Sequence, residues 1–202
     1  KPVAASLQRA DMGGSLSTRE LTDVAAVLRA ARTAGDYGAS QEKSPISHLF
    51  QALTPNRFLE ERITNSILGE DEIADSASPE LASIRRHMRA AEAKVRDILQ
   101  RLISSNQSKY LQESIITIRS DRYVVPVKSE HKNAIPGLVH DVSSSGSTFF
   151  IEPMGVVKAN NELRELAAKE KKEIERILAE LSADCAAHKE DILEDYQLIV
   201  WL

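Results

Sequence analysis

The residue types best suited to catalysis gather in one short stretch, where His140 and Asp141 are followed closely by Ser143, Ser144 and Ser145. A serine nucleophile needs a base within hydrogen-bond reach, and that base needs a third group to orient it. Successive residues of a strand point to opposite faces, so His140 and Asp141 are poorly placed to act as a pair. The serine-rich stretch itself has the composition of a hairpin loop. We therefore expect no catalytic residue in this chain.

Metal ligation is equally poorly supported by the residue types. The five histidines share no metal-ligand spacing, and only one cysteine is present to join them: His48, His87, His131, His140, His188 and Cys185. A single cysteine also excludes an intrachain disulfide, which fits a reducing compartment. Because Cys185 falls on a helical apolar stripe, we expect it to be a small packing residue. No metal and no cofactor is predicted from these residues.

Cationic side chains are the more promising candidates, and one group of them shares a predicted sheet and its turns with a tyrosine: Arg119, Arg122, Tyr123, Lys128, His131 and Lys132. Lysine and arginine there could neutralise nucleic-acid phosphates without reading the bases. Between Ile115 and Pro153, however, four Lys/Arg face four Asp/Glu, so ordinary solvated residues remain the alternative. Arg85, Arg86 and Arg89 form a secondary basic patch, which we interpret as a solvated helix face. The alternative is that this patch lines a groove for phosphate or rRNA.

Composition narrows the class of protein. Hydrophobic residues make up 42% of the chain and aromatics only 4%, which favours helices packed through Leu, Ile and Ala. The formal net charge of −4 does not mark a nucleic-acid binder. No apolar run approaches the roughly 18–20 residues that span a bilayer, and no signal peptide is recognisable, so we expect a cytoplasmic protein without a membrane partner. The chain lacks an initial methionine and ends in the apolar run Leu198–Leu202, which leads us to expect a fragment of a longer protein.

Short helices are predicted for residues 1–77, which we interpret as a helical base. Ser17 and Glu20 have the spacing of a capping box at a helix start. The run Gly35–Gly38 is predicted to end that helix, and a further short helix is expected over Ile46–Leu53.

Two long helices are expected to frame the sheet. Ser78 and Pro79 form a strong helix start for the first, residues 78–110. Its apolar residues alternate spacings of three and four, as in a coiled coil: Leu81, Ile84, Met88, Ala91, Val95, Ile98 and Leu102. The second, residues 154–202, is predicted as one continuous helix opened by Pro153. The counts of Lys/Arg against Asp/Glu are seven against three in Glu80–Lys109 and seven against eleven in Met154–Leu202, which suits an antiparallel pair.

Residues 111–153 are predicted to form a small antiparallel sheet. Ile115–Ile118 and Tyr123–Val127 are strand-like, with Ser120 and Asp121 as the turn between them. A second strand pair is expected over Ile135–Val142 and Thr148–Ile151. Pro126 indicates an edge strand or a bulge, and Gly137 and Gly146 are expected at turns or bulges. The predicted fold is mainly α: a long antiparallel two-helix coiled-coil lever on a helical base, with a β clamp at its tip.

Five sequence strings, in order, carry a family resemblance: Asp75–Leu81, Arg122–Lys128, Ile135–Asp141, Ser145–Pro153 and Asn160–Leu166. Residues from Ser76 to about Leu193 resemble the core, lever and clamp region of MutS-type proteins. The match is to the bacterial MutS-II paralogue that carries a C-terminal Smr nuclease domain. Residues 1–75 fit it more loosely, through Gly13–Leu16 and Leu28–Arg32.

The resemblance implies a full-length protein that is a homodimeric DNA-binding ATPase and endonuclease, using ATP and Mg. It also implies a nucleic-acid partner. This partner is either branched DNA, in the suppression of recombination, or rRNA on collided ribosomes. This chain has no GxxxxGK[ST] loop, so it offers no phosphate cradle for ATP. Our leading hypothesis is a non-catalytic nucleic-acid clamp. The alternative is a structural, dimerisation or protein-interaction lever without nucleic-acid affinity, and an apolar tip formed by Phe149 or Phe150 would favour it.

Overall fold

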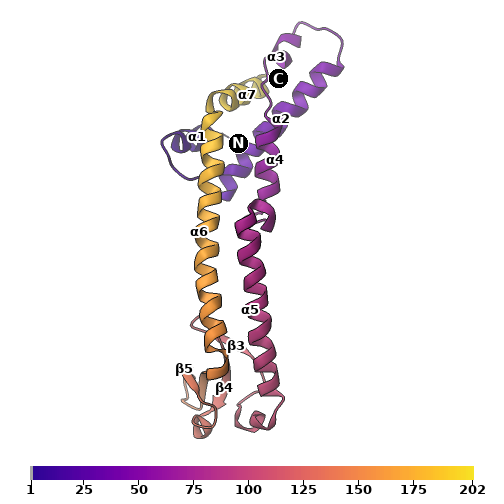
Figure 1. Ribbon diagram of the computed structural model, residues 1–202. Coiled ribbons are helices and arrows are strands. Elements are labelled where there is room, and N and C mark those ends of the chain that lie inside the picture. The colour runs from indigo at the N-terminus through magenta and orange to yellow at the C-terminus, as the bar shows by residue number, and fades with distance from the viewer. Residues whose placement is uncertain (1) are drawn as a thin grey trace. The chain divides into compact units, whose positions relative to one another are not determined.

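The computed structural model describes residues 2–202, and the chain divides into two compact units. The first unit contains the residues up to Ala82 together with Lys172–Leu202, and the second contains Ser83–Lys171. Figure 1 labels the main elements. Two helices belong to both units: α5 (Pro79–Ile103) and α6 (Val157–Ala187). No helix among residues 2–202 combines the length and the apolar composition needed to cross a membrane.

The first unit is helical apart from one small hairpin. Its elements are α1 (Ala4–Asp11), α2 (Thr18–Ser40), α3 (Ser47–Gln51), α4 (Arg57–Ser66), β1 (Ile67–Gly69), β2 (Glu72–Ile73), the start of α5, the end of α6 and α7 (Lys189–Trp201). Aliphatic side chains from all the longer helices form one core, which includes Leu21, Leu28, Leu59, Leu81 and Leu181. The antiparallel pair β1–β2 was not predicted, because two strands this short carry no alternating pattern.

The predicted start of α2 is confirmed and its predicted end is wrong. Ser17 Oγ accepts a hydrogen bond from the Glu20 N–H, and the Glu20 carboxylate accepts one from the Ser17 N–H. The helix then continues through both glycines to Ser40. A Cβ at Gly38 would lie 2.4 Å from Phe50 Cβ, so this glycine lets α3 pack against α2. The close packing of α3 on α2, and not helix termination, explains why residue 38 is glycine.

The C-terminal helix is also not continuous as predicted. It breaks at His188, whose φ and ψ are −114° and 20°, between α6 and α7. Neither glycine nor proline marks this break in the sequence. The turn lets α7 bury Ile192 in the core of the first unit, and that packing outweighs the preference of the sequence for one helix.

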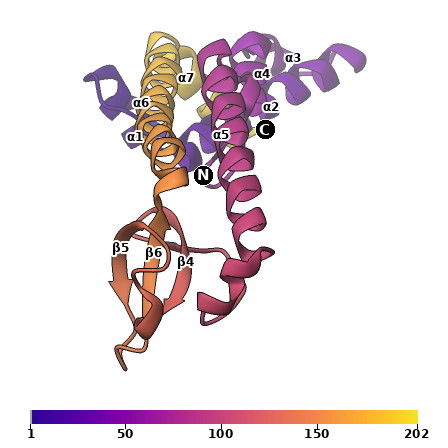
Figure 2. The same ribbon diagram turned by 60° about the horizontal axis from the view of Figure 1, so that its bottom comes forward.

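The second unit contains an antiparallel four-stranded sheet with the order β3-β4-β6-β5. Figure 2 shows β4, β6 and β5 side by side. The strands are β3 (Thr117–Arg119), β4 (Arg122–Lys128), β5 (Gly137–Val142) and β6 (Thr148–Pro153). All four predicted strands are therefore confirmed, with shifted ends. One face of the sheet packs on α5 and on the start of α6, through a core that includes Val95, Leu99, Val127, Ile151 and Val156.

Local geometry explains two predicted features of β4. Ser120 and Asp121 both have positive φ, 51° and 59°, and form the predicted two-residue turn between β3 and β4. Pro126 lies in a strand with neighbours on both sides, yet β3 pairs with β4 only as far as Val124. Gln112 N–H donates to the Pro126 carbonyl at 2.9 Å on that side of β4. The missing N–H of Pro126 therefore interrupts no strand pairing.

Asp195 of α7 leads to a prediction about pH. Its Oδ1 accepts from the Thr54 N–H at 2.8 Å, whereas Oδ2 is buried with no hydrogen-bond partner among the described residues. Burial raises the pKa of this carboxyl, the bonds from Thr54 oppose the rise, and the charge of Asp191 adds to it. A raised folded-state pKa means that ionisation costs stability as pH rises through that pKa. We expect Asp195→Asn, which keeps the Oδ1 acceptor, to gain stability relative to the parent chain as the pH rises above about 4, the ordinary pKa of an aspartate.

Urea unfolding at a series of pH values measures the free energy of unfolding of the parent chain and of the variant. Taking the difference between the two chains at each pH cancels the contribution of the other carboxyl groups. The matched control is Glu190→Gln, a change at an exposed residue on the same helix. A stability difference between Asp195→Asn and the parent chain that does not change with pH would contradict the prediction.

Candidate nucleic-acid interface

The six residues of the predicted interface separate into two groups at opposite ends of β4. Arg119, Arg122 and Tyr123 lie at the hairpin between β3 and β4, whereas Lys128 ends β4. His131 and Lys132 belong to the short turn that follows it. The structure therefore does not bring all six together, and each group has its own chemistry.

Both arginines of the first group are held by carboxylates. Arg122 Nη1 lies 3.0 Å from Oε2 of Glu152, and the two side chains are 13% and 0% exposed, so this pair belongs to the interior. Arg119 Nε lies 3.3 Å from Oδ2 of Asp141, and its guanidinium stacks over the Phe150 ring at 4.1 Å. An arginine whose charge is already balanced by a carboxylate is a poor partner for phosphate.

Glu152 is the centre of a polar network that sequence reasoning missed. Its Oε1 lies 3.0 Å from His140 Nε2, and its Oε2 accepts a 2.7 Å hydrogen bond from Nδ2 of Asn160, in addition to the bond from Arg122. The sequence signal that could have revealed this network is the charged Glu152 itself, which lies between Ile151 and Pro153 inside a strand. His140 and Asp141 contact different partners, which agrees with the expectation that they do not act as a pair.

Tyr123 is fixed through its backbone. Asn160 Oδ1 accepts from the Tyr123 N–H at 3.4 Å, and Asn160 Nδ2 donates to the Tyr123 carbonyl at 3.2 Å. The Asn160 side chain thus pairs with β4 at a level that β6 does not reach, since the pairing of β4 with β6 ends at Val125 and Ile151. The ring of Tyr123 packs under Arg96, 5.4 Å from the ring centre. These contacts give Tyr123 a structural role.

The second group forms what we call the distal cluster, defined as Lys109, Lys128, His131 and Lys132. His131 packs against the Tyr110 ring at 5.1 Å between centres, and Lys109 lies 5.1 Å from the centre of that same ring. Lys132 lies 5.4 Å from the centre of the Phe149 ring. Within residues 2–202, no ion pair engages any of the three lysines.

One carboxylate and the serine-rich loop between β5 and β6 accompany the distal cluster. The pKa of Glu130 is lowered by its own backbone N–H and by the nearby charges of His131 and Lys128. The loop between β5 and β6 joins the same end of the sheet, because the Ser129 N–H donates to the Ser147 carbonyl at 3.0 Å. Gly146 has a φ of 72°, which confirms the turn predicted there. Three ammonium groups against one carboxylate leave this end of the sheet positive.

Comparisons with known proteins add a decisive observation. Over 189 residues the chain is 52% identical to the Endonuclease MutS2 of Ruminiclostridium cellulolyticum, an alignment that covers 91% of this chain. It is 52% identical over 191 residues, 93% of the chain, to that of Pelotomaculum thermopropionicum. It is 45% identical over its full length to that of Lachnospira eligens.

The chain belongs to the MutS-II family. No protein-family model matches it. The three alignments cover 24%, 24% and 26% of the relatives, so this chain spans about a quarter of the length of the curated MutS2 proteins it matches.

Arginines of the secondary basic patch of this MutS-II chain already interact with other groups of the chain. Arg85 Nε lies 2.9 Å from Oε2 of Glu170, and the two side chains are 20% and 28% exposed. Arg86 and Arg89 are exposed on α5. Further along α5, Arg96 and Arg101 pair with Glu92 and Asp97, each one helical turn away. Much of the positive charge on this MutS-II helix is therefore balanced locally.

The cysteine and the possible metal ligands of the MutS-II chain form no further candidate site among the described residues. Cys185 is buried, and burial raises the pKa of its thiol to about 12, which confirms a packing role. Among residues 2–202, no three His, Cys, Asp or Glu side chains are grouped so that they could hold a metal ion.

Proposed function

We propose that the second unit of this chain is the nucleic-acid clamp of a MutS-II protein, and that the distal cluster is its point of contact. The observation that carries the proposal is the sorting of charge. Of the four Lys/Arg between Ile115 and Pro153, Arg119 and Arg122 are each paired with a carboxylate. Lys128 and Lys132 lie at the other end of β4 and have no ion-pair partner in the described part of the chain. The region between Ile115 and Pro153 has equal numbers of basic and acidic residues, yet the end of β4 near Lys128 is positively charged.

The proposed ligand is a sugar-phosphate backbone, without base readout. Lysine ammonium groups and serine hydroxyls are typical phosphate contacts, and they carry no sequence information. Recognition of single strands depends on aromatic rings that are free to stack with bases. Tyr110 and Phe149 are instead half-buried and covered by His131, Lys109 and Lys132. These contacts favour a helical duplex, in branched DNA or in rRNA, over a single strand.

In this proposal the parts of the chain take the roles expected from the sequence. Residues 1–77 are the base, 78–110 and 154–202 the two arms of a coiled-coil lever, and 111–153 the clamp. The endonuclease named in the relatives, an ATPase using ATP and Mg, and the homodimer are assigned to the remainder of the full-length protein.

A protein-interaction lever is the second candidate, and a different observation favours it. The edge strand β5 exposes Leu138, Val139 and Val142 at 48%, 49% and 42%. From the sequence, an outward-facing apolar tip formed by Phe149 or Phe150 would favour this candidate. Lys132 lies over the Phe149 ring and Arg119 over the Phe150 ring, so these contacts favour the clamp instead.

Charge reversal separates the two candidates. We expect Lys128→Glu combined with Lys132→Glu to weaken binding to a four-way junction, a plain DNA duplex and an rRNA helix by at least about tenfold each at low salt, because two phosphate contacts become repulsive. Fluorescence anisotropy with labelled ligands measures this.

The matched control is Lys171→Glu combined with Lys172→Glu, which changes the net charge equally on exposed residues of α6. Equal losses in the two double variants would attribute binding to net charge and reject the distal cluster. An absence of binding by the parent chain to all three ligands would favour the protein-interaction lever.

A further inference from the structure

The first unit is acidic, which the net charge of the whole chain does not show. Its two segments contain eleven Lys/Arg and twenty Asp/Glu, a net charge of −9, against −4 for the whole chain. A surface of this sign attracts cationic partners and repels nucleic acid. A binding surface on this unit is therefore expected to favour a basic group.

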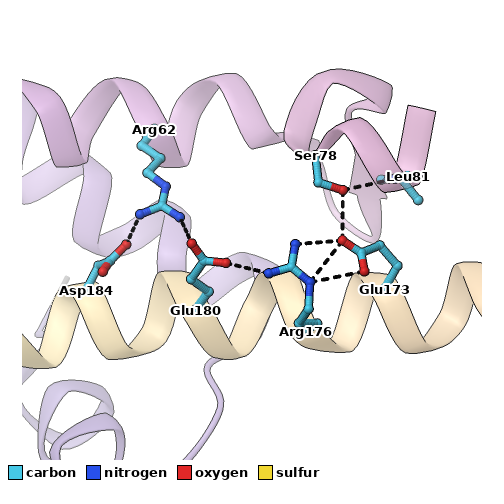
Figure 3. Close-up of polar contacts among 7 residues, drawn as sticks. All are labelled: Arg62, Ser78, Leu81, Glu173, Arg176, Glu180 and Asp184. Atoms are coloured by element: carbon cyan, nitrogen blue, oxygen red, sulfur yellow. Dashed lines mark hydrogen bonds and ion pairs between the residues drawn. The ribbon is translucent and has the colours of Figure 1, made fainter. Parts of the chain in front are cut away.

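Three carboxylates of this unit, all on α6, are already paired with arginines (Figure 3). Arg176 donates a 2.6 Å hydrogen bond to Glu173 and another of 2.6 Å to Glu180. Arg62 of α4 binds both Glu180 and Asp184. The bonds from Arg176 lower the pKa of Glu173, against the effect of its burial. These carboxylates are therefore engaged within the unit and are not free for a partner.

Glu194 of α7 is different, because it lines a hollow beside an exposed tryptophan. The hollow has a volume of about 250 Å³, and the residues that line it are Ala52, Glu194, Gln197, Leu198 and Trp201. The last four follow the spacing i, i+3, i+4 and i+7, so they share one face of α7. Glu194 is exposed, and no ion pair engages its carboxylate among residues 2–202. Trp201 is 79% exposed.

The groups in this hollow match the parts of an arginine side chain. A carboxylate accepts two parallel hydrogen bonds from a guanidinium, and the face of a tryptophan ring attracts the positive charge. Leu198 and Ala52 are apolar and suit the aliphatic stem of the same side chain. A planar guanidinium can pair with the carboxylate and stack on the ring at once, which a lysine ammonium cannot do. The hollow therefore favours arginine over lysine.

We propose that this hollow binds an arginine side chain from a basic segment of a partner protein. In the complex, Glu194 pairs with the guanidinium, Trp201 stacks on it, and Leu198 contacts the stem. All the lining residues belong to the first unit. The site is therefore separate from the distal cluster and does not depend on the proposed binding of nucleic acid.

Trp201 is the only tryptophan of the chain, so tryptophan fluorescence reports on this hollow alone. The probe is a blocked tetrapeptide that contains one arginine and one leucine. Its matched control carries citrulline in place of arginine, which keeps the shape of the side chain and removes the charge. We expect the arginine peptide to change the emission of Trp201 saturably, and to bind at least about threefold more tightly than the citrulline peptide. Added salt should weaken this binding.

A substitution in the hollow tests the role of the carboxylate. Glu194→Gln should weaken binding of the arginine peptide at least about threefold, because an amide carries no charge. The matched control is Glu190→Gln, an exposed residue one turn away on the same helix, which should keep the affinity of the parent chain. Circular dichroism checks that both variants are folded. Equal affinity of Glu194→Gln and the parent chain would overturn the proposal, as would equal binding of the two peptides.

Two further measurements distinguish other occupants of the hollow. Trp201 emission that changes with the concentration of the chain alone, without peptide, would assign the hollow to a second copy of this chain. Calorimetry with the full-length MutS-II protein tests the remaining occupant. If the arginine peptide binds this chain and not the full-length protein, another segment of that protein fills the hollow. Either result would overturn a partner protein as the occupant.

Discussion

Replacing Glu152 by alanine is expected to lower the free energy of unfolding of the second unit by about 3–5 kcal/mol, the usual cost of removing one partner from a buried ion pair. Glu152 is fully buried, and its carboxylate is the shared partner of Arg122, His140 and Asn160. Without it, a guanidinium that is only 13% exposed loses its counter-charge. Two strands and the start of α6 also lose their common contact.

Amide exchange at Val125 and Ile151 measures this loss, because both residues pair in the centre of the sheet. Glu152→Gln, which keeps two polar atoms in place, should cost about half as much. The control is Asp141→Ala, whose pair with Arg119 is 51% exposed on the acid side and should contribute less than about 1 kcal/mol. A Glu152→Ala chain as stable as the Asp141→Ala chain would show that the network is not structural.

The second large effect is expected at Gly137, where alanine should destabilise the second unit by about 2–3 kcal/mol through overpacking. An added Cβ would lie 2.2 Å from the Glu152 carbonyl oxygen and 2.8 Å from Ile151 Cγ2. Since the nearest obstacle is backbone, no side-chain rotation relieves the contact, and β5 must move away from β6. The sequence-based interpretation placed a turn or bulge here, whereas close approach of two strands is the reason for glycine.

Gly35→Ala provides the matched control for this change. Gly35 lies inside α2, and an added Cβ would meet nothing within 4 Å, so alanine should raise stability by about 0.5–1 kcal/mol. Urea unfolding followed by circular dichroism measures both variants. If Gly137→Ala were neutral, the tight packing of β5 on β6 would be contradicted.

Sequence patterns predicted the elements whose signal is local. The apolar residues of α5 recur at spacings of three and four. Four of the seven, Leu81, Ile84, Ala91 and Val95, are buried, and the other three are partly buried. The β-branched runs of the second unit and the Ser120–Asp121 turn are likewise local, and the structure places strands and turn there. Ser17 and Ser78 both cap the helices they were expected to start.

Features that depend on distant contacts were not predictable in this way. The break at His188 has no local signal, because it follows from the packing of α7 on the first unit. The partners of Arg119 and Arg122 are 22 and 30 residues away, so the sequence showed only a balance of charges. That balance hid the difference on which the candidate interface depends: two arginines paired with carboxylates and, at the other end of β4, two lysines without carboxylate partners in the described chain.

The salt dependence of duplex binding tests the central claim, contact of the distal cluster with phosphate, most directly. The logarithm of the association constant for a plain DNA duplex falls with the logarithm of salt concentration by about 0.9 per phosphate contact. We predict that Lys128→Ala combined with Lys132→Ala makes this slope shallower by about 2, whereas Lys171→Ala combined with Lys172→Ala leaves it unchanged. A slope that is the same in the parent chain and in the Lys128/Lys132 variant would contradict the account.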